Sequence, residues 1–234
     1  MSNKPFNLLL SAFPEHVYEH ISSDIEEVNL VQGQTLYRTN EQITYVYFPL
    51  ETAISLVVTL ADSSATEVSM VGYQGMIGLA AILGRNQSPY ESIVQIPGKA
   101  IMLPAPILRQ EFLRSEALRN LLLLYAQAQT KQIAQIAACQ TNHLIEQRLA
   151  RWLLLARDAI KNETLPVTQK LISRMLGVRR ASITEAAISL QQAGVIEYSR
   201  GQIRILQPQL LESRCCECYQ KIKQEYNFLL AVDP

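Results

Sequence analysis

Hydrophobic and polar positions in the first half of the chain form short runs separated by turn residues. Seven runs rich in β-branched and aromatic residues cover 28–31, 35–37, 45–48, 54–60, 67–71, 93–96 and 100–103, after a short helical pattern at 14–22. Many short strands at close spacing are typical of an antiparallel roll or sandwich rather than of a parallel sheet with helical crossovers.

Apolar positions change to a helical rhythm after Pro106. No glycine or proline occurs from 107 to 165, and the spacing of apolar residues predicts a long helix followed by a second helix at 142–161. The apolar stripe of the long helix is longer than that of a typical globular helix. The polar residues Gln129 and Gln132 interrupt it, and coiled-coil seams tolerate such polar residues. We therefore expect it to pair with a second copy of the chain, the alternative being an interior helix of the monomer. The expected dimer contacts are Leu118, Leu121, Leu122, Tyr125, Ala128, Gln132 and Ile136.

Residues 166–206 have the spacing of two short helices followed by a hairpin. Thr168 is a predicted helix N-cap, Gly177 ends the first helix, the second runs from about Arg180 to Ala193, and two short strands with a turn at 199–202 follow. This order predicts a winged helix-turn-helix, whose second helix fits the major groove of DNA. The predicted DNA contacts are Thr168, Gln169, Lys170, Arg179, Arg180, Ser182, Thr184, Glu185, Ser199 and Arg200.

Charge is distributed unevenly although the formal net charge is zero. Residues 1–107 contain four basic and ten acidic residues, whereas 108–234 contain seventeen basic and eleven acidic residues. A polyanion is attracted only to the basic half, which makes nucleic acid a candidate partner of the C-terminal half alone, and the helix-turn-helix specifies double-stranded DNA.

Three stretches resemble the Crp/Fnr family of transcription regulators: GYQGMIGLAAILG, EQRLARWLLLARD and ISRMLGVRRASITEAAISLQQAGVIEYSRGQIRI. The resemblance covers the whole chain and implies an α+β fold with three parts. These are an antiparallel β-roll sensor domain at 1–107, a dimerisation helix at 108–140 and a winged helix-turn-helix domain at 141–234. It also makes RNA polymerase a candidate partner.

The sensor motif departs from that of cyclic-AMP-binding members. The family glutamate that takes the ribose hydroxyl aligns with Met76, and the arginine that takes the cyclic phosphate aligns with Gln87. A neutral amide lacks the charge and the fork of a guanidinium, so we expect no tight cyclic-AMP binding and leave the sensor ligand unknown. Arg85 is the one nearby substitute. The degenerate pocket comprises Gly75, Met76, Gly78, Leu79, Arg85, Gln87 and Ser88.

Cysteines and histidines are few, and we expect no metal or cofactor. An N-terminal iron–sulfur motif is excluded because no cysteine precedes Cys139. Cys215, Cys216 and Cys218 are expected as thiols within a helical segment at 210–230, with other ligands poorly placed, and a redox role stays open. His16 and His20 are four residues apart, but no third ligand accompanies them.

These patterns together predict a homodimeric transcription regulator that binds a pseudo-palindromic operator. The alternative is a regulatory subunit that uses the β-roll to bind a protein partner, which would have no use for a basic helix-turn-helix. No nucleophile, base and oxyanion set can be assembled, so an enzyme is not expected and no catalytic residue is assigned. No stretch is apolar over the 18 to 20 or so residues that span a bilayer, and we expect a cytoplasmic protein without a membrane partner.

Overall fold

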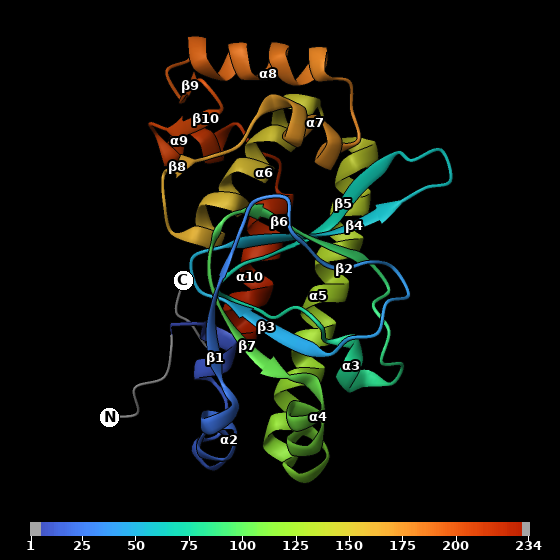
Figure 1. Ribbon diagram of the computed structural model, residues 1–234. Coiled ribbons are helices and arrows are strands. Elements are labelled where there is room, and N and C mark those ends of the chain that lie inside the picture. Colours follow the sequence, from blue (N-terminus) through green and yellow to red (C-terminus); the bar gives the residue numbers. More distant parts are fainter. Residues whose placement is uncertain (1–5, 231–234) are drawn as a thin grey trace.

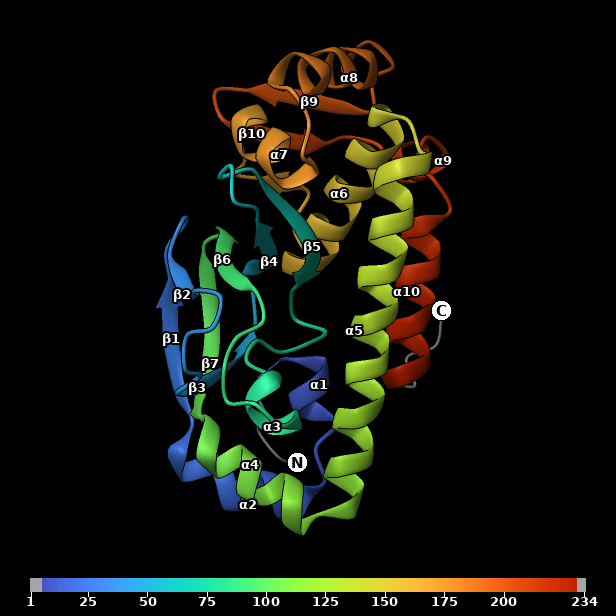
Figure 2. The same ribbon diagram turned by 90° about the vertical axis from the view of Figure 1, so that its right-hand side faces the viewer.

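The computed structural model describes residues 6–230, arranged as a β-roll with helices below, beside and above it (Figure 1). Helices α2 (Glu15–Ile21) and α4 (Ala105–Arg114) lie at the base, and the helix-turn-helix caps the opposite end. Helix α5 (Glu116–Asn142) runs along one side of the roll, with α10 (Cys218–Leu230) beside it (Figure 2). No described helix is both long enough and apolar enough to cross a membrane.

Two antiparallel sheets form the roll, as the sequence predicted. One sheet has the strand order β1 (Glu26–Leu30), β7 (Gly98–Pro104), β3 (Tyr45–Pro49), and the other has the order β2 (Thr35–Tyr37), β6 (Glu91–Ile96), β4 (Ala53–Thr59), β5 (Ala65–Val71). All seven predicted strands are present, with ends shifted by a few residues. Their inward side chains, among them Val46, Phe48, Ile54, Val94 and Leu103, are fully buried and form the core between the sheets.

Short helical turns fill the ends of the roll. The sequence predicted α2 but not α1 (Leu8–Ser11), the 3₁₀ turn η1 (Ser22–Asp24) or α3 (Ala80–Leu83). The Asn7 side chain caps α1 and also donates to the carbonyls of Pro49 and Gly75, at 2.8 and 2.9 Å. This fully buried amide therefore fixes the N-terminal segment to the end of β3 and to the loop that follows β5.

The long predicted helix is two helices. The Ser115 side chain accepts a hydrogen bond from the Leu118 amide and caps α5, while its own extended backbone ends α4. The predicted helix at 108–140 therefore contains a break that the sequence expectation missed, because a serine followed by helix formers is also compatible with a continuous helix.

The dimer contacts expected on α5 are mostly interior residues of one chain, which corrects the prediction. Leu118, Leu122, Tyr125, Ala128, Gln132 and Ile136 are all at most 2% exposed, and only Leu121 is half-buried. The reason is that α10 and the roll pack on this face. Gln132 donates to the Met70 carbonyl of β5 at 3.1 Å and accepts from the Tyr226 hydroxyl of α10 at 2.7 Å, so its polar group is satisfied inside the monomer.

The C-terminal half is built on α6 (Ile145–Ile160). The elements after it are β8 (Thr164–Leu165), α7 (Gln169–Leu176), α8 (Arg180–Gln192), β9 (Ile196–Ser199), β10 (Gln202–Ile205), α9 (Pro208–Ser213) and α10. The strands pair in the order β8-β10-β9, and β8 is a third strand that the sequence did not predict. The predicted helical segment at 210–230 is also interrupted, because α9 ends at Ser213 and α10 starts only at Cys218.

A buried carboxyl group joins the two halves. Glu67 of β5 accepts hydrogen bonds from the Ser55 hydroxyl and, at 3.1 Å, from the Trp152 indole of α6. Burial raises the pKa of Glu67 from its ordinary value of 4.5 to about 7, although these hydrogen bonds and the charge of Arg151 favour the carboxylate.

The raised pKa of Glu67 predicts a pH dependence of stability. The folded protein holds the Glu67 proton more tightly than the unfolded chain does. The resulting contribution of Glu67 to the free energy of unfolding is therefore complete below about pH 4.5 and is lost as the pH rises to about 7. Glu67→Gln should remove this decline. The free energy of unfolding of the variant should therefore rise relative to that of the wild type between pH 5 and pH 8. Urea denaturation across this range measures it. Glu26→Gln, at an exposed position of β1, controls for the loss of one charge, and parallel wild-type and Glu67→Gln curves would contradict the prediction.

Candidate DNA interface and sensor cavity

Helix α8 lies across one end of the molecule with its outer face free of other elements (Figures 1 and 2). Its inner face consists of Ile183, Ala186, Ala187 and Leu190, all buried. Arg180, Ala181, Glu185 and Ile188 are exposed on the outer face. The amphipathic spacing thus aims one row of side chains at the protein core and the opposite row at solvent.

The turn between α7 and α8 requires a glycine. Gly177 ends α7 with φ of +62°, a conformation that side chains disfavour. A Cβ atom there would also come within 2.9 Å of the Thr66 hydroxyl of the roll. At the other end of α7, the Thr168 hydroxyl accepts from the Leu171 amide at 3.2 Å, which confirms the predicted cap.

The wing is a tight hairpin between β9 and β10. Arg200 and Gly201 both have positive φ, of 39° and 84°, and Ser199 pairs with Gln202 across the turn. Two consecutive positive φ values are those of a type I′ turn, whose twist matches antiparallel strands. The exposed Ser199 and Arg200 side chains are therefore held at the tip of the hairpin.

The predicted DNA contacts divide into exposed and internal residues. Lys170, Arg179, Arg180, Glu185, Thr168, Ser199 and Arg200 are exposed, and Ser182 is half-buried. Gln169 is buried, and its side-chain oxygen accepts from the Thr184 hydroxyl at 2.8 Å. This pair ties α7 to α8 inside the motif. Sequence spacing could not separate Gln169 from its exposed neighbours Thr168 and Lys170, since all three lie at the start of α7.

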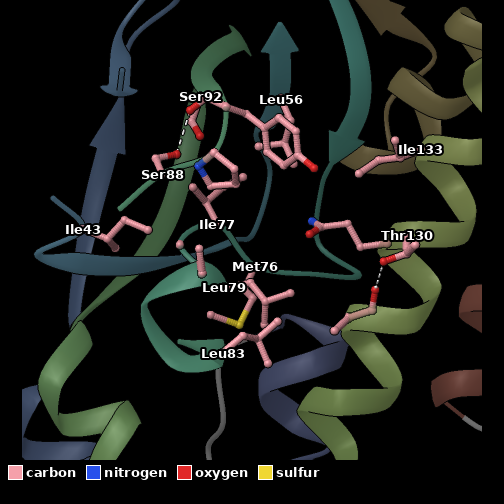
Figure 3. Close-up of a pocket in the computed structure, with 16 residues that line it drawn as sticks. Ile43, Leu56, Met76, Ile77, Leu79, Leu83, Ser88, Ser92, Thr130 and Ile133 are labelled. Carbon is pink, nitrogen blue, oxygen red and sulfur yellow. Dashed lines mark hydrogen bonds between the residues drawn. The ribbon is translucent and has the colours of Figure 1, made fainter. Parts of the chain in front are cut away.

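A cavity of about 190 Å³ opens between the roll and α5 (Figure 3). Met76, Gly78, Leu79 and Ser88 of the predicted pocket line it. Arg85 and Gln87 are exposed and are not among the lining residues, so the structure brings neither to the cavity. Gly75 lies nearby against Tyr125, where a Cβ atom would meet the tyrosine oxygen at 2.4 Å.

Helix α5 supplies a wall of the cavity that the sequence did not reveal. Ala126, Gln129, Thr130 and Ile133 line it from this side. Gln129 was one of the two polar residues that suggested a coiled-coil seam, and in the structure it faces the cavity instead. Its position in an otherwise apolar stripe was the one available signal.

Tyr125 holds the cavity floor to α5. Its buried hydroxyl accepts from the Met76 amide at 2.9 Å and donates to the Met76 carbonyl at 3.0 Å. Burial raises the pKa of Tyr125, so the hydroxyl keeps the proton that it donates. The side chain of Met76 is itself fully buried. The position that aligns with the family glutamate is therefore apolar and fixed by its backbone.

The cavity lining carries no charge. Its polar side chains are Ser88, Tyr90, Ser92, Gln129 and Thr130, and the Ser88 hydroxyl is already used on the Tyr90 carbonyl at 2.7 Å. The remaining lining residues are apolar. Such a site suits a small neutral group better than a phosphate, which needs a cation or several amide donors.

Two family models match the sequence. The model of the cyclic nucleotide-binding domain matches residues 27–115, and that of the Crp-like helix-turn-helix domain matches residues 147–214. Together they span well over half of the chain. No curated protein matches the sequence.

Solved structures share the fold at low sequence identity. A protein from Eubacterium rectale described as a Crp/Fnr-family transcriptional regulator has a TM-score of 0.68 and 17% identity, over 91% of this chain and 97% of that one. FixK2 from Bradyrhizobium japonicum has a TM-score of 0.70 and 14% identity, over 82% and 98%. A CRP-family transcriptional regulator from Thermus thermophilus has a TM-score of 0.63 and 19% identity, over 80% and 95%.

The structural likeness supports the fold, and the two matched domains support the family. Each domain model matches the half of the chain in which the structure places the corresponding domain, the roll first and the helix-turn-helix second. The chain therefore belongs to the Crp/Fnr family of transcription regulators, whose members are not enzymes.

Proposed function

We propose that the protein regulates transcription as a homodimer that binds a pseudo-palindromic operator. The observation that carries this proposal is the unobstructed face of α8, with Arg179 and Arg180 exposed at its N-terminal end and Arg200 on the neighbouring wing. A helix of this kind enters the major groove with its first residues at the bases, while the wing reaches the backbone. RNA polymerase is the protein partner that this function implies.

A different stripe of α5 from the one first predicted supports the dimer. Residues at alternating spacings of three and four remain exposed along the helix: Leu123, Gln127, Thr130, Ala134, Ala137 and Thr141. This is the heptad spacing of a coiled-coil seam, and its small side chains allow two helices to approach closely. Thr130 also lines the cavity, so a second subunit on this stripe would border the sensor site.

The dimer proposal predicts that charge on this stripe produces monomers. Ala134→Glu combined with Ala137→Glu would place four like charges on the paired helices, a repulsion without compensating contacts. Light scattering after gel filtration should then give half the wild-type mass. Ala117→Glu, exposed on α5 about a third of a turn from the stripe, should remain dimeric. A wild-type monomer at micromolar concentration would contradict the proposal.

The DNA interface predicts different roles for Arg180 and Arg200. Arg180→Ala should cost roughly 1 to 3 kcal/mol on the specific site and relax preference at one base pair, because a guanidinium can pair with guanine O6 and N7. Arg200→Ala should weaken binding to every sequence. It should also reduce the slope of log affinity against log salt concentration by about one. Selection from random DNA followed by mobility shifts at several salt concentrations measures both. If Arg180→Ala lost equal affinity for specific and random DNA, Arg180 would contact phosphate groups and not a base.

The sensor cavity predicts that cyclic AMP is not the ligand. A volume of about 190 Å³ is below the range of roughly 300 to 1,000 Å³ typical of small-molecule sites, and its lining is uncharged. Calorimetry should detect no binding of cyclic AMP or cyclic GMP at micromolar concentration and no change in DNA affinity. Micromolar binding would overturn this and would direct attention to Arg85, an exposed cation two residues before Gln87.

A further inference from the structure

Four metal-ligating side chains from distant parts of the chain meet where α5 ends. Cys139 lies in the last turns of α5, His143 is its C-cap, Cys216 precedes α10 and Cys218 begins it. Their ligand atoms all lie within 4.8 Å of one another. The expectation that further ligands near the C-terminal cysteines are poorly placed was therefore wrong, because α10 folds back along α5 across 75 or more residues of sequence.

The spacing of these atoms fits one tetrahedral ion. The sulfurs of Cys139 and Cys216 are 3.5 Å apart, and the Cys218 sulfur is 3.6 Å from Nδ1 of His143. With Zn–S near 2.3 Å and Zn–N near 2.0 to 2.1 Å, a tetrahedral site has edges of about 3.8 Å between sulfurs and about 3.5 Å between sulfur and nitrogen. Thiols this close leave no room for the irons and sulfides of a polynuclear cluster.

Neighbouring groups orient the candidate ligands. The imidazole of His143 turns Nδ1 toward Cys218, and its Nε2 is 3.2 Å from a carboxylate oxygen of Glu217. The Gln135 side-chain amide donates to the Cys218 sulfur at 3.1 Å. A carboxylate behind a ligating histidine and an N–H donor on a ligating sulfur are the supports that zinc sites use to fix ligand geometry.

Burial shields the candidate ligands, and a buried cation lies on the same side of the fold. Cys139 and Cys218 are fully buried and Cys216 is 5% exposed, so these sulfurs are shielded from solvent oxidants. Arg151 of α6 is fully buried, and its positive charge favours the thiolate form of Cys139. Within the described residues its Nε and one terminal nitrogen have no hydrogen-bond partner. Three thiolates around a divalent ion carry a net negative charge, which the Arg151 guanidinium would balance.

We infer that Cys139, His143, Cys216 and Cys218 bind one Zn²⁺ ion with tetrahedral geometry. Each thiol releases its proton to solvent on binding, and His143 coordinates as a neutral ring through Nδ1. The ion connects the end of α5, the turn that leads into α6 and the start of α10. It therefore fixes the hinge between the α5 helix and the DNA-binding domain. This role at the hinge rests on the proposed function, whereas the metal site itself does not.

The metal site is tested on the reduced full-length protein with Zn²⁺ and Co²⁺ as probes. The wild type should retain about one Zn²⁺ per protomer after dialysis. Co²⁺ should give the visible bands of tetrahedral coordination and a near-ultraviolet thiolate charge-transfer band. Cys139→Ser, Cys216→Ser, Cys218→Ser and His143→Ala should each lose retained zinc. Cys215→Ser is the matched control, because this half-exposed thiol lies outside the group of four, and it should keep the ion.

Three results would overturn the metal site. One is a reduced wild-type protein that retains neither Zn²⁺ nor a tetrahedral Co²⁺ spectrum, a measurement that does not depend on any variant folding. Another is iron with acid-labile sulfide in place of zinc. The third is a Cys139–Cys216 disulfide that forms under mild oxidation in the zinc-loaded protein as readily as in the metal-free protein, which would make the pair a redox centre.

Two further measurements test zinc binding and the role of zinc at the hinge independently. Glu217→Gln, which keeps all four ligands, should weaken zinc affinity roughly ten- to a hundredfold, and unchanged affinity would remove the carboxylate from the site. Removing zinc with a chelator should lower operator affinity at least about fivefold, and adding Zn²⁺ should restore that affinity. The operator affinity of the Cys139→Ser variant should not respond to the chelator. Unchanged operator affinity with confirmed zinc loss would overturn the hinge role and leave the metal site standing. Failure of all DNA binding, with or without zinc, would count against the proposed function instead.

Discussion

Helix α5 packs on the roll through one side and on α10 through another, and these contacts determine which surfaces remain for function. Tyr125 holds the Met76 backbone, and Gln132 bridges β5 to α10 through two hydrogen bonds. The cavity borders the middle of this helix and the cysteine and histidine cluster closes its end. A displacement of α5 would therefore reach the sensor cavity, the exposed heptad stripe and the hinge together.

Local patterns in the sequence were sufficient for much of the fold. The seven strands of the roll and the helix-turn-helix were predicted because alternation, caps and glycine turns are encoded within a few residues. Thr168 and Gly177 are examples, since each fixes a helix end by its own chemistry. The exposure of Arg180 and Arg200 was predictable from the same local patterns.

What the sequence could not supply was the identity of packing partners. The apolar stripe from Leu118 to Ile136 correctly indicated a buried face, but periodicity does not say whether a second subunit or the chain's own α10 covers it. Gln129 likewise signalled an unusual environment without showing that it was a cavity wall. The grouping of Cys139 with Cys216 depends on a 77-residue separation that only the fold closes.

The carboxyl group of Glu67 has a consequence for how the molecule can be divided. Its partners Ser55 and Trp152 belong to different halves, and the Gln32 amide adds a second link by donating to the Pro166 carbonyl at 2.8 Å. Buried polar groups that satisfy one another across a boundary are left without partners when one side is removed. The roll and the winged helix should thus melt as a single cooperative unit, and a truncated fragment carrying only the winged helix would leave the Trp152 indole without the carboxylate that accepts its hydrogen bond.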